Sequence, residues 1–505
     1  MLKNLLFLEI LIVIGSVIFH MASTRATRRE IGPLPGIILG SMAAIAFLAP
    51  SMIVAHIGIA LVPLVLGRTK LKVGIIVGVG LFALPALPTN IVIGGVWIFQ
   101  WTIQSTLAVS ALIAFFIAPG KPAASLPWAY SSMMIVIMIL IVVDARGGAL
   151  TGYFRSLAYY TFVYAIPIFL VTRSARNATE WRTLFMAMAG AGVTLAIIIL
   201  YEAAAGWPLY SAIAPNLGVD AHGVVVKWRG GLMRAYGPML EATNMGCVLV
   251  ICFTAALAAR RAFVSNMAYI AVVSIIAFGS LAPQSRGGMI GVAVAFVMSS
   301  FYRRGAGGMG QVSLAALFLG GAYAGAMMIG SVGSQISTSL NEAEGSGDYR
   351  SELLRRGLQE FWKSPIFGDS YTNVVARMQD LVQGEGIVDF VNTYLYFALF
   401  SGAIGLFLFC IAFIIPMMRL AQIRRLLPAN SDEREAGGFC LALLVSAAVM
   451  LVFTSYLQRP SIFFLIASSL AMMIRVPRRA VSAPRLLPTA PIKMRDDPQP
   501  AVTAL

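Results

Sequence analysis

Seven basic side chains between residues 227 and 356 have the types and positions to bind an anion. They are Lys227, Arg229 and Arg234 in one hydrophilic segment, Arg286 at the edge of an apolar segment, and Arg350, Arg355 and Arg356 in a second hydrophilic segment. Arginine suits phosphate because its planar guanidinium makes two parallel hydrogen bonds and stays charged in a partly dry site. The set predicts a site for a lipid-linked diphosphate; the alternative is that each side chain only reaches lipid headgroups.

Arg286 is the first candidate in this set. The stretch 285–304, SRGGMIGVAVAFVMSSFYRR, is an apolar run with arginine at both ends. The pair at its C-terminal end is typical of a helix that leaves a membrane on the cytoplasmic side. Arg286 then lies at the outer edge, where a cation is least expected, and the neighbouring Ser285 and Gly287 would let a ligand or another backbone come close.

The composition indicates which elements must position these residues. The chain has 505 residues, of which 59% are hydrophobic and 11% charged, and its mean hydropathy is +0.84. Soluble domains have about 25% charged residues. Apolar runs recur from residue 4 to residue 475, which leaves no room for a separate soluble core. We therefore expect one polytopic transmembrane domain over residues 1–475.

Candidate membrane spans follow one another along this domain. They begin near residues 4, 34, 52, 73, 97, 128, 155, 184, 239, 265, 287, 310, 390, 437 and 460. The region 34–67 is divided by Pro50, and the region 83–97 is broken by prolines, so the expected count ranges from about 12 to about 15. The expected fold class is an all-α polytopic membrane helix bundle of about 12 to 15 spans, with a large periplasmic loop that contains an amphipathic helix.

The net charge of +16 sits in short clusters between apolar runs. This pattern is a topology signal and argues against nucleic acid as a partner. It places Arg260, Arg303, Arg419 and the C-terminus in the cytoplasm. Residues 476–505 are basic and proline-rich and are expected to form a disordered cytoplasmic tail.

Neither the cysteine spacing nor any nucleotide-binding motif indicates a cofactor. The four cysteines, Cys247, Cys252, Cys410 and Cys440, lie in apolar runs without a CxxC pair or a histidine cluster, so we expect packing residues and no metal site. No P-loop, HExxH or GxSxG with partners occurs, which leaves ATP-driven transport, zinc proteolysis and serine hydrolysis without support.

With the basic clusters inside, two long hydrophilic segments fall outside, residues 205–238 and 334–389. In the second, YRSELLRRGLQEFWKS repeats apolar side chains at helical spacing, with Leu354, Leu358, Phe361 and Trp362 on one side. We expect a helix that lies on the membrane surface or over a cavity.

Three motifs in this order resemble the superfamily of bacterial O-antigen ligases and O-antigen polymerases. They are Ser285-Arg286-Gly287-Gly288 opening a helix, GDYRSELLRRGLQEFWKSPIFGDS before the next span, and VNTYLYFALFSGAIG opening that span. The resemblance covers roughly residues 230–420. It implies a protein of the bacterial inner membrane that joins glycans carried on undecaprenyl diphosphate at the periplasmic face, without a metal ion or cofactor. It also implies that Arg286, Arg234 and Arg350 hold the donor diphosphate.

One departure from this family concerns the base. Ligases carry a His-Asn pair, nine residues and Gly-x-x-Gly; here Asn392, Gly402 and Gly405 occupy those positions, but Val391 replaces the histidine. Valine cannot accept a proton, so another group must deprotonate the acceptor hydroxyl if a side chain does so. Asp389 is the first candidate and Glu241 the second, although either carboxylate could instead be solvated or paired with an arginine.

A second departure is Ser370, which stands where the motif Pro-x-x-Gly-x-Gly would place its second glycine. The backbone after Gly368 is therefore expected to differ from that of the family.

The first functional hypothesis is an inverting glycosyltransferase that polymerises exopolysaccharide or O-antigen (lipopolysaccharide) repeat units. The nearest alternative is a ligase that moves a finished glycan to lipid A core or protein. The third is a flippase for lipid-linked oligosaccharides, but a transporter would need charges deep in its spans, and here the cations gather at one face. Expected partners are the lipid-linked glycan and membrane lipids, and a chain-length regulator is a further candidate.

Overall fold

The computed structural model describes residues 1–124, 126–146, 148, 150–219, 226–229, 231–304, 336–382, 388–454 and 459–476. The expected span near residue 310 and nearly all of the expected tail lie outside these ranges. The fold is mostly helical, at 74%, which confirms the expected class of polytopic helical membrane protein.

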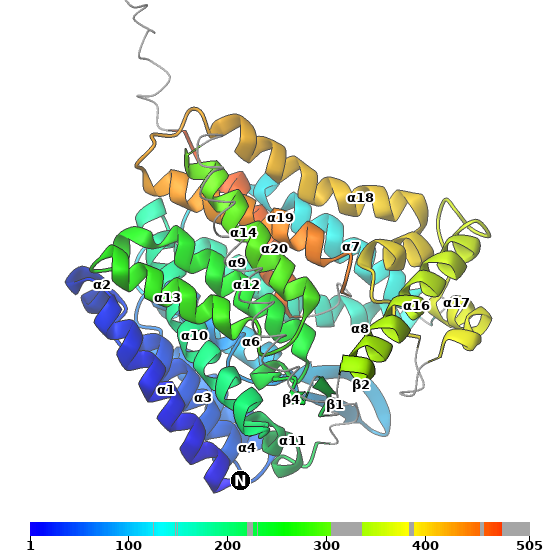
Figure 1. The fold of residues 1–505 in the computed structure, drawn as a ribbon, viewed down its shortest axis with the longest axis horizontal. Coiled ribbons are helices and arrows are strands. Elements are labelled where there is room, and N and C mark those ends of the chain that lie inside the picture. The colour runs from blue at the N-terminus through cyan, green and yellow to red at the C-terminus, as the bar shows by residue number, and fades with distance from the viewer. Residues whose placement is uncertain are drawn as a thin grey trace, which may run out of the picture.

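The longer helices follow one another along the chain (Figure 1). They are α1 (Leu2–Ala22), α2 (Arg25–Glu30), α3 (Leu34–Leu48), α4 (Met52–Leu66), α5 (Lys70–Gly80), α6 (Ile103–Ile117), α7 (Ser131–Ala145), α8 (Leu150–Tyr160), α9 (Ile166–Ser174), α10 (Ala178–Ala205), α11 (Ile213–Asn216), α12 (Ala242–Ala258), α13 (Asn266–Gly279), α14 (Arg286–Arg304), α16 (Ile336–Phe361), α17 (Tyr371–Arg377), α18 (Thr393–Ile423), α19 (Asp432–Met450) and α20 (Pro460–Met473).

Short helices and strands connect them. The short helices are η1 (Pro127–Tyr130), η2 (Thr161–Ala165), η3 (Leu209–Ala212), η4 (Gly237–Met239), η5 (Arg260–Ala262) and η7 (Gln379–Leu381), and the strands are β1 (Pro88–Ile93), β2 (Val96–Thr102), β3 (Trp228–Arg229) and β4 (Leu232–Met233). The strands form two antiparallel hairpins, β1 with β2 and β3 with β4.

The membrane character rests on helix length and composition. Within the described ranges five apolar segments are long enough to cross a bilayer: Leu2–Ala22, Pro127–Ala145, Leu150–Ser174, Ala178–Ala205 and Thr393–Ile423. Several shorter apolar helices, including α3, α4, α6, α12, α13 and α20, accompany them. The number of spans, about 12 to 15, stays a prediction.

Helix α10 lies at the centre of the bundle. Its apolar stretch is 89% buried, and it packs against α1, α12 and α13. Helix α14 packs on α12 and α19. A Cβ at Gly288 would lie 3.0 Å from the Cα of Gly246, so these glycines let α14 and α12 approach closely.

The first hairpin corrects one expectation. The span expected to begin near residue 97 begins at Ile103, because residues 96–102 form strand β2. Gly94 and Gly95 make the turn with φ of +58° and +78°, as a tight hairpin requires. His56 of α4 anchors its base: Thr106 links the His56 ring, at 2.7 Å, to the Trp101 indole, also at 2.7 Å.

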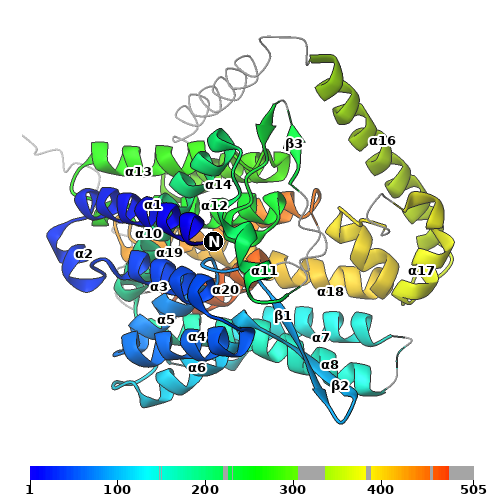
Figure 2. The same cartoon turned by 90° about the horizontal axis from the view of Figure 1, so that it is seen from below.

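The basic clusters meet at one end of the bundle. Asp432, in the first turn of α19, lies 2.9 Å from Arg182 and 3.6 Å from Arg261. Arg434 donates to the carbonyl of Arg303 at 3.0 Å. Helix α14 runs from this end to Arg286 at the other. In Figure 2, α2 lies at the left end, and α16 and α17 lie at the right.

Candidate functional site

Arg286 opens α14 at the end of the bundle opposite to the basic clusters. The hydroxyl of the preceding Ser285 accepts from the Gly288 amide at 3.3 Å, and Ser285 itself is buried at 4% exposure. A Cβ at Gly287 would meet only ordinary contacts at 3.6 Å. Arg286 is exposed, and within the described part of the chain its guanidinium has no ion pair or hydrogen bond. It is therefore available to an anion.

Hairpin β3–β4 places two more arginines beside this helix start. Arg229 donates to the carbonyl of Gln284 and Arg234 to that of Pro283, both at 3.3 Å. Both arginines thus hold the turn that precedes α14, with Gln284 at φ +51°. Burial and the neighbouring charge of Arg229 lower the pKa of Arg234. Arg234 therefore supports the backbone of the site and also adds positive charge to it.

Arg350 of α16 completes the cationic group. Burial, and then the charges of Arg286 and Arg229, lower the pKa of Arg350, while Asp389 opposes this. Repulsion among three guanidinium groups is costly unless an anion offsets it. The three guanidinium groups thus form a cationic group that an anion such as a phosphate would complement.

Asp389 is held in place by Tyr349. The Tyr349 hydroxyl donates to the Asp389 carbonyl at 3.2 Å and accepts from the Asp389 amide at 3.1 Å. Because Tyr349 and Arg350 are adjacent in α16, the same turn of that helix fixes the backbone of Asp389 and positions Arg350. The carboxylate lies close enough to Arg350 and to Glu241 to act on both.

Glu241 precedes α12 and faces the same group. Water reaches its side chain, yet many protein atoms surround the carboxylate. These surroundings raise the pKa of Glu241; the neighbouring Asp389 raises it further, while a hydrogen bond from Thr243 and the charges of Arg234 and Lys227 lower it. A carboxyl group with a raised pKa is better able to accept a proton than an ordinary glutamate.

The structure therefore brings Arg286, Arg234, Arg350, Asp389 and Glu241 into one electrostatically coupled group. They come from α14, the β3–β4 segment, α16 and the starts of α18 and α12 (Figure 1). Two other cations of the predicted set do not join them. Arg355 pairs with Glu352, with Nε 2.8 Å from the carboxylate, and Arg356 pairs with Asp380 at 3.0 Å.

The motif after Val391 serves the helix that follows it. Asn392 caps α18, and its side-chain oxygen accepts from the amides of Tyr394 and Leu395 at 3.0 and 3.1 Å. Thr393 then donates to the Thr454 carbonyl at 2.5 Å. This cap fixes where α18 begins, four residues after Asp389.

Gly402 lies away from the cationic group and makes a joint between backbones. It interrupts α18 with φ +68° and ψ −169°, a combination open essentially to glycine alone. A Cβ there would lie 2.2 Å from the Ile366 carbonyl oxygen, and one at Gly368 would lie 2.5 Å from that of Leu399. Across this joint the Asp369 amide donates to Leu399 at 2.9 Å. The glycines of two predicted motifs thus meet.

Arg146, which sequence reasoning missed, closes the same joint. Its guanidinium donates to the carbonyls of Phe367 at 2.5 Å and Phe400 at 3.1 Å, one on each side. A single arginine after an apolar run resembles an ordinary topology signal, so no local pattern singles it out. We refer to residues 365–369, the break at Gly402 and Arg146 together as the loop–helix joint.

The two remaining motif positions have local explanations. Ser370 caps α17 by accepting from the Asn373 amide at 3.3 Å, with φ −68°. A second glycine is therefore unnecessary here, which accounts for the departure from Pro-x-x-Gly-x-Gly. Gly405 lies against Ser401 within α18.

Comparison with known proteins supports the resemblance. Residues 271–410 match the family described as O-Antigen ligase, which confirms the similarity predicted from the motifs over this segment. Members of that family are glycan-transferring membrane enzymes of ligase and polymerase type. The match contains Arg286, Arg350 and Asp389. No curated protein matches the chain.

Proposed function

We propose that this protein is a membrane glycosyltransferase that polymerises undecaprenyl-diphosphate-linked repeat units at the periplasmic face of the bacterial inner membrane. The observation that carries the proposal is the coupled group of Arg286, Arg350 and Asp389. It places guanidinium groups beside a carboxylate, which is what the transfer of a sugar from a diphosphate requires. The family match supports glycan transfer.

The reaction needs few protein groups. The hydroxyl oxygen of the acceptor sugar forms a bond to the anomeric carbon of the donor sugar, and the bond from that carbon to the diphosphate oxygen breaks. The electron pair leaves with undecaprenyl diphosphate, and the hydroxyl proton passes to Asp389 or Glu241. Attack opposite to the leaving group inverts the configuration. The arginines stabilise the charge that develops on the leaving oxygen.

The distribution of charged residues supports an orientation in which Arg286 faces the periplasm. The end that carries Asp432 gathers the basic clusters, as a cytoplasmic end does. The cationic group at Arg286 then faces the periplasm, where the lipid-linked units are joined. The C-terminus, by the same argument, is cytoplasmic.

A ligase is the second candidate, and the description of the matched family favours it. Only the acceptor differs: lipid A core or a protein replaces another lipid-linked unit. Val391 at the family's histidine position argues for the polymerase. A deletion strain distinguishes the two. We expect single lipid-linked units to accumulate in it; long unattached chains would instead identify a ligase, and an unchanged glycan profile would contradict both.

A further inference from the structure

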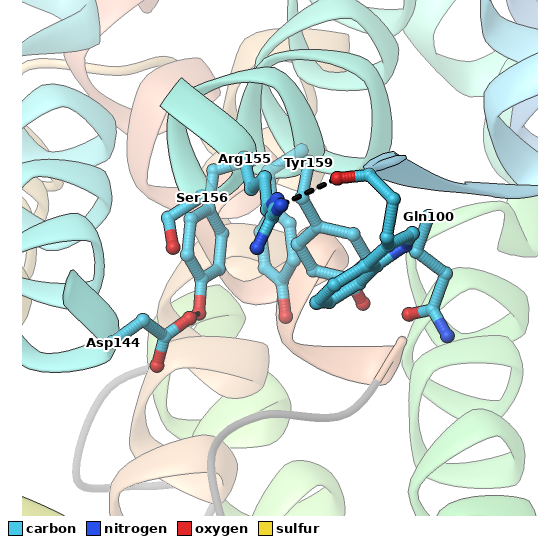
Figure 3. A pocket seen from close by; sticks show the side chains of 8 residues that line it. Gln100, Asp144, Arg155, Ser156 and Tyr159 are labelled. Carbon is cyan, nitrogen blue, oxygen red and sulfur yellow. Dashed lines mark hydrogen bonds between the residues drawn. The ribbon is translucent and has the colours of Figure 1, made fainter. Parts of the chain in front are cut away.

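A second polar cavity lies outside the cationic group. It has a volume of about 330 Å³ and is lined by Trp97 and Gln100 of β2, Asp144 of α7, and Arg155, Ser156, Tyr159, Tyr160 and Tyr164 of α8 and η2. Figure 3 shows Asp144 on one side and Gln100 on the other, with Ser156, Arg155 and Tyr159 between them. None of these residues belongs to the catalytic proposal.

Several polar groups in this cavity make no hydrogen bond within the described residues. Tyr160 donates to one Asp144 carboxylate oxygen at 2.6 Å, and the other oxygen accepts no hydrogen bond within the described residues. The side chains of Gln100, Ser156 and Tyr159 likewise make none there. Together they offer a carboxylate, an amide and two hydroxyl groups, a mixture of donors and acceptors. Such a mixture suits a ligand with several hydroxyl groups.

The cation of the cavity is already engaged. Arg155 donates to the carbonyls of Trp97 and, at 3.1 Å, of Ile98. Its guanidinium also lies 4.3 Å from the Trp97 ring centroid. It therefore ties the hairpin to α8. Because Arg155 is the only cation among the residues that line the cavity and is already engaged, the cavity suits an uncharged ligand better than a phosphate.

Aromatic rings form the rest of the wall. Tyr159 stacks edge to face on Tyr160 with centroids 5.2 Å apart, and Trp97 is 45% exposed. Aromatic faces pack well against the apolar C–H faces of sugar rings, and the hydroxyl groups of the sugar can hydrogen-bond to polar side chains. The volume lies near the lower end of the usual range for ligand pockets, about 300 to 1,000 Å³, which suits a short piece of a glycan.

The cavity is connected to the cationic group through one arginine. The charge of Arg459 acts on Tyr159, and the same guanidinium donates to the Pro238 carbonyl at 3.1 Å. Pro238 is three residues before Glu241. Arg459 thus links the segment that precedes Glu241 to the neighbourhood of the cavity.

We propose that this cavity is a subsite for the uncharged sugar rings of the glycan substrate. The inference rests on the proposed function for the identity of its ligand, but it can be tested without turnover. The probe is the repeat-unit oligosaccharide released from the host's own polysaccharide, without lipid or diphosphate. Its dissociation constant is measured by calorimetry with the full-length protein in detergent.

Trp97→Ala and Gln100→Ala should each weaken oligosaccharide binding about ten-fold, equivalent to about 1.4 kcal/mol. Trp128→Ala is the matched control. Trp128 is also 45% exposed and also carries an arginine, Arg419, over its ring at 4.9 Å. This control, and Arg286→Ala, should bind the oligosaccharide as the unaltered chain does.

Equal affinity in all variants, or no binding by the unaltered chain, would overturn the inference. The inference would also be overturned if phosphatidylglycerol vesicles, but not the oligosaccharide, shielded the residues of the cavity from solvent. The cavity would then be a site for lipid headgroups. A different result would contradict the proposed function alone: the chain would bind the oligosaccharide through Trp97 but form no glycosidic bond.

Discussion

At the scale of single residues, the proposed chemistry rests on Arg286. Its guanidinium is exposed and has no protein partner among the described residues, whereas the nearby Arg355 and Arg356 are paired with carboxylates. If this side chain only anchored the helix at the membrane surface, a lysine would serve as well as an arginine. If it binds a diphosphate through two parallel hydrogen bonds, a lysine would not serve.

We therefore predict that Arg286→Lys impairs glycan transfer severely although charge is retained, and that Arg286→Ala is worse. Each charge-assisted hydrogen bond lost costs about 1.5 to 3 kcal/mol, or roughly one to two powers of ten in rate. Product yield, normalised to the level of the protein in membranes, is the measurement. Arg355→Ala is the control and should stay near normal. Full activity of Arg286→Ala at normal abundance would assign this arginine to headgroup anchoring.

The two carboxylates allow a second prediction. Asp389→Asn should lower transfer about 10²- to 10⁴-fold and leave donor binding nearly intact, while Glu241→Gln keeps most of the activity. Near-normal activity of Asp389→Asn with an inactive Glu241→Gln would move the base to Glu241.

If Glu241 is the base, the acid limb of the pH–rate profile should be shifted to higher pH. The pKa of Glu241 is raised by its protein surroundings, so the carboxylate loses its proton only at a higher pH than an ordinary glutamate, whose pKa is about 4.3. The acid limb of the rate profile would lie above that value. An acid limb at or below it would exclude Glu241 as the base.

At the scale of elements, the loop–helix joint ties α16 to α18. Residues 365–369 follow α16, which carries Arg350, and bond to the backbone of α18, which begins just after Asp389. The joint fixes this connection by backbone hydrogen bonds and by Arg146. We expect the joint to position both elements, because a side chain at Gly368 or Gly402 would clash with the facing backbone.

Gly402→Ala should lower the stability of the folded protein by about 1 to 3 kcal/mol from backbone strain alone, and the 2.2 Å clash with Ile366 adds to this. Thermal unfolding in detergent measures the effect. Gly78→Ala is the matched control, because a Cβ at buried Gly78 meets only an ordinary contact at 3.6 Å. An equal, small shift for both variants would argue against the joint.

The sequence predicted most helices and missed features that depend on distant contacts. Apolar runs located the spans of α1, α3, α4, α12 and α18 within a few residues, because a bilayer demands long apolar helices. The β1–β2 hairpin was missed, although Gly94-Gly95 between β-branched and aromatic residues is a hairpin signal. The run of apolar residues concealed it.

Helix α16 was predicted, but the sequence did not show which of its faces packs on protein. Three members of the apolar stripe, Leu354, Leu358 and Trp362, are exposed, at 46%, 49% and 72%, whereas Phe361 packs partly buried against the core. The helix buries Leu353 instead, and Gly357 lies against Leu395 of α18. Periodicity finds an apolar stripe but cannot tell whether protein or lipid covers it. The exposed stripe fits the expected place on a membrane surface.

At the scale of the whole molecule, the account requires the cationic group and the basic clusters to face opposite sides of the membrane. We predict that a cysteine at Thr372→Cys, exposed on α17, reacts with an impermeant maleimide in intact spheroplasts. One at Ala26→Cys, exposed on α2, should react only after permeabilisation. The unaltered chain is the control, since three of its four cysteines are buried. The reverse pattern would invert the topology and remove the periplasmic reaction.

Reconstitution tests the central claim most directly. The purified chain in liposomes is given lipid-linked repeat units as both donor and acceptor, and glycan length and released undecaprenyl diphosphate are measured together. We predict longer glycans, with one undecaprenyl diphosphate released for each bond formed, and the loss of both in Arg286→Ala. Unchanged glycan length with the unaltered chain would contradict polymerisation, and a wild-type rate in Arg286→Ala would contradict the assignment of the donor site.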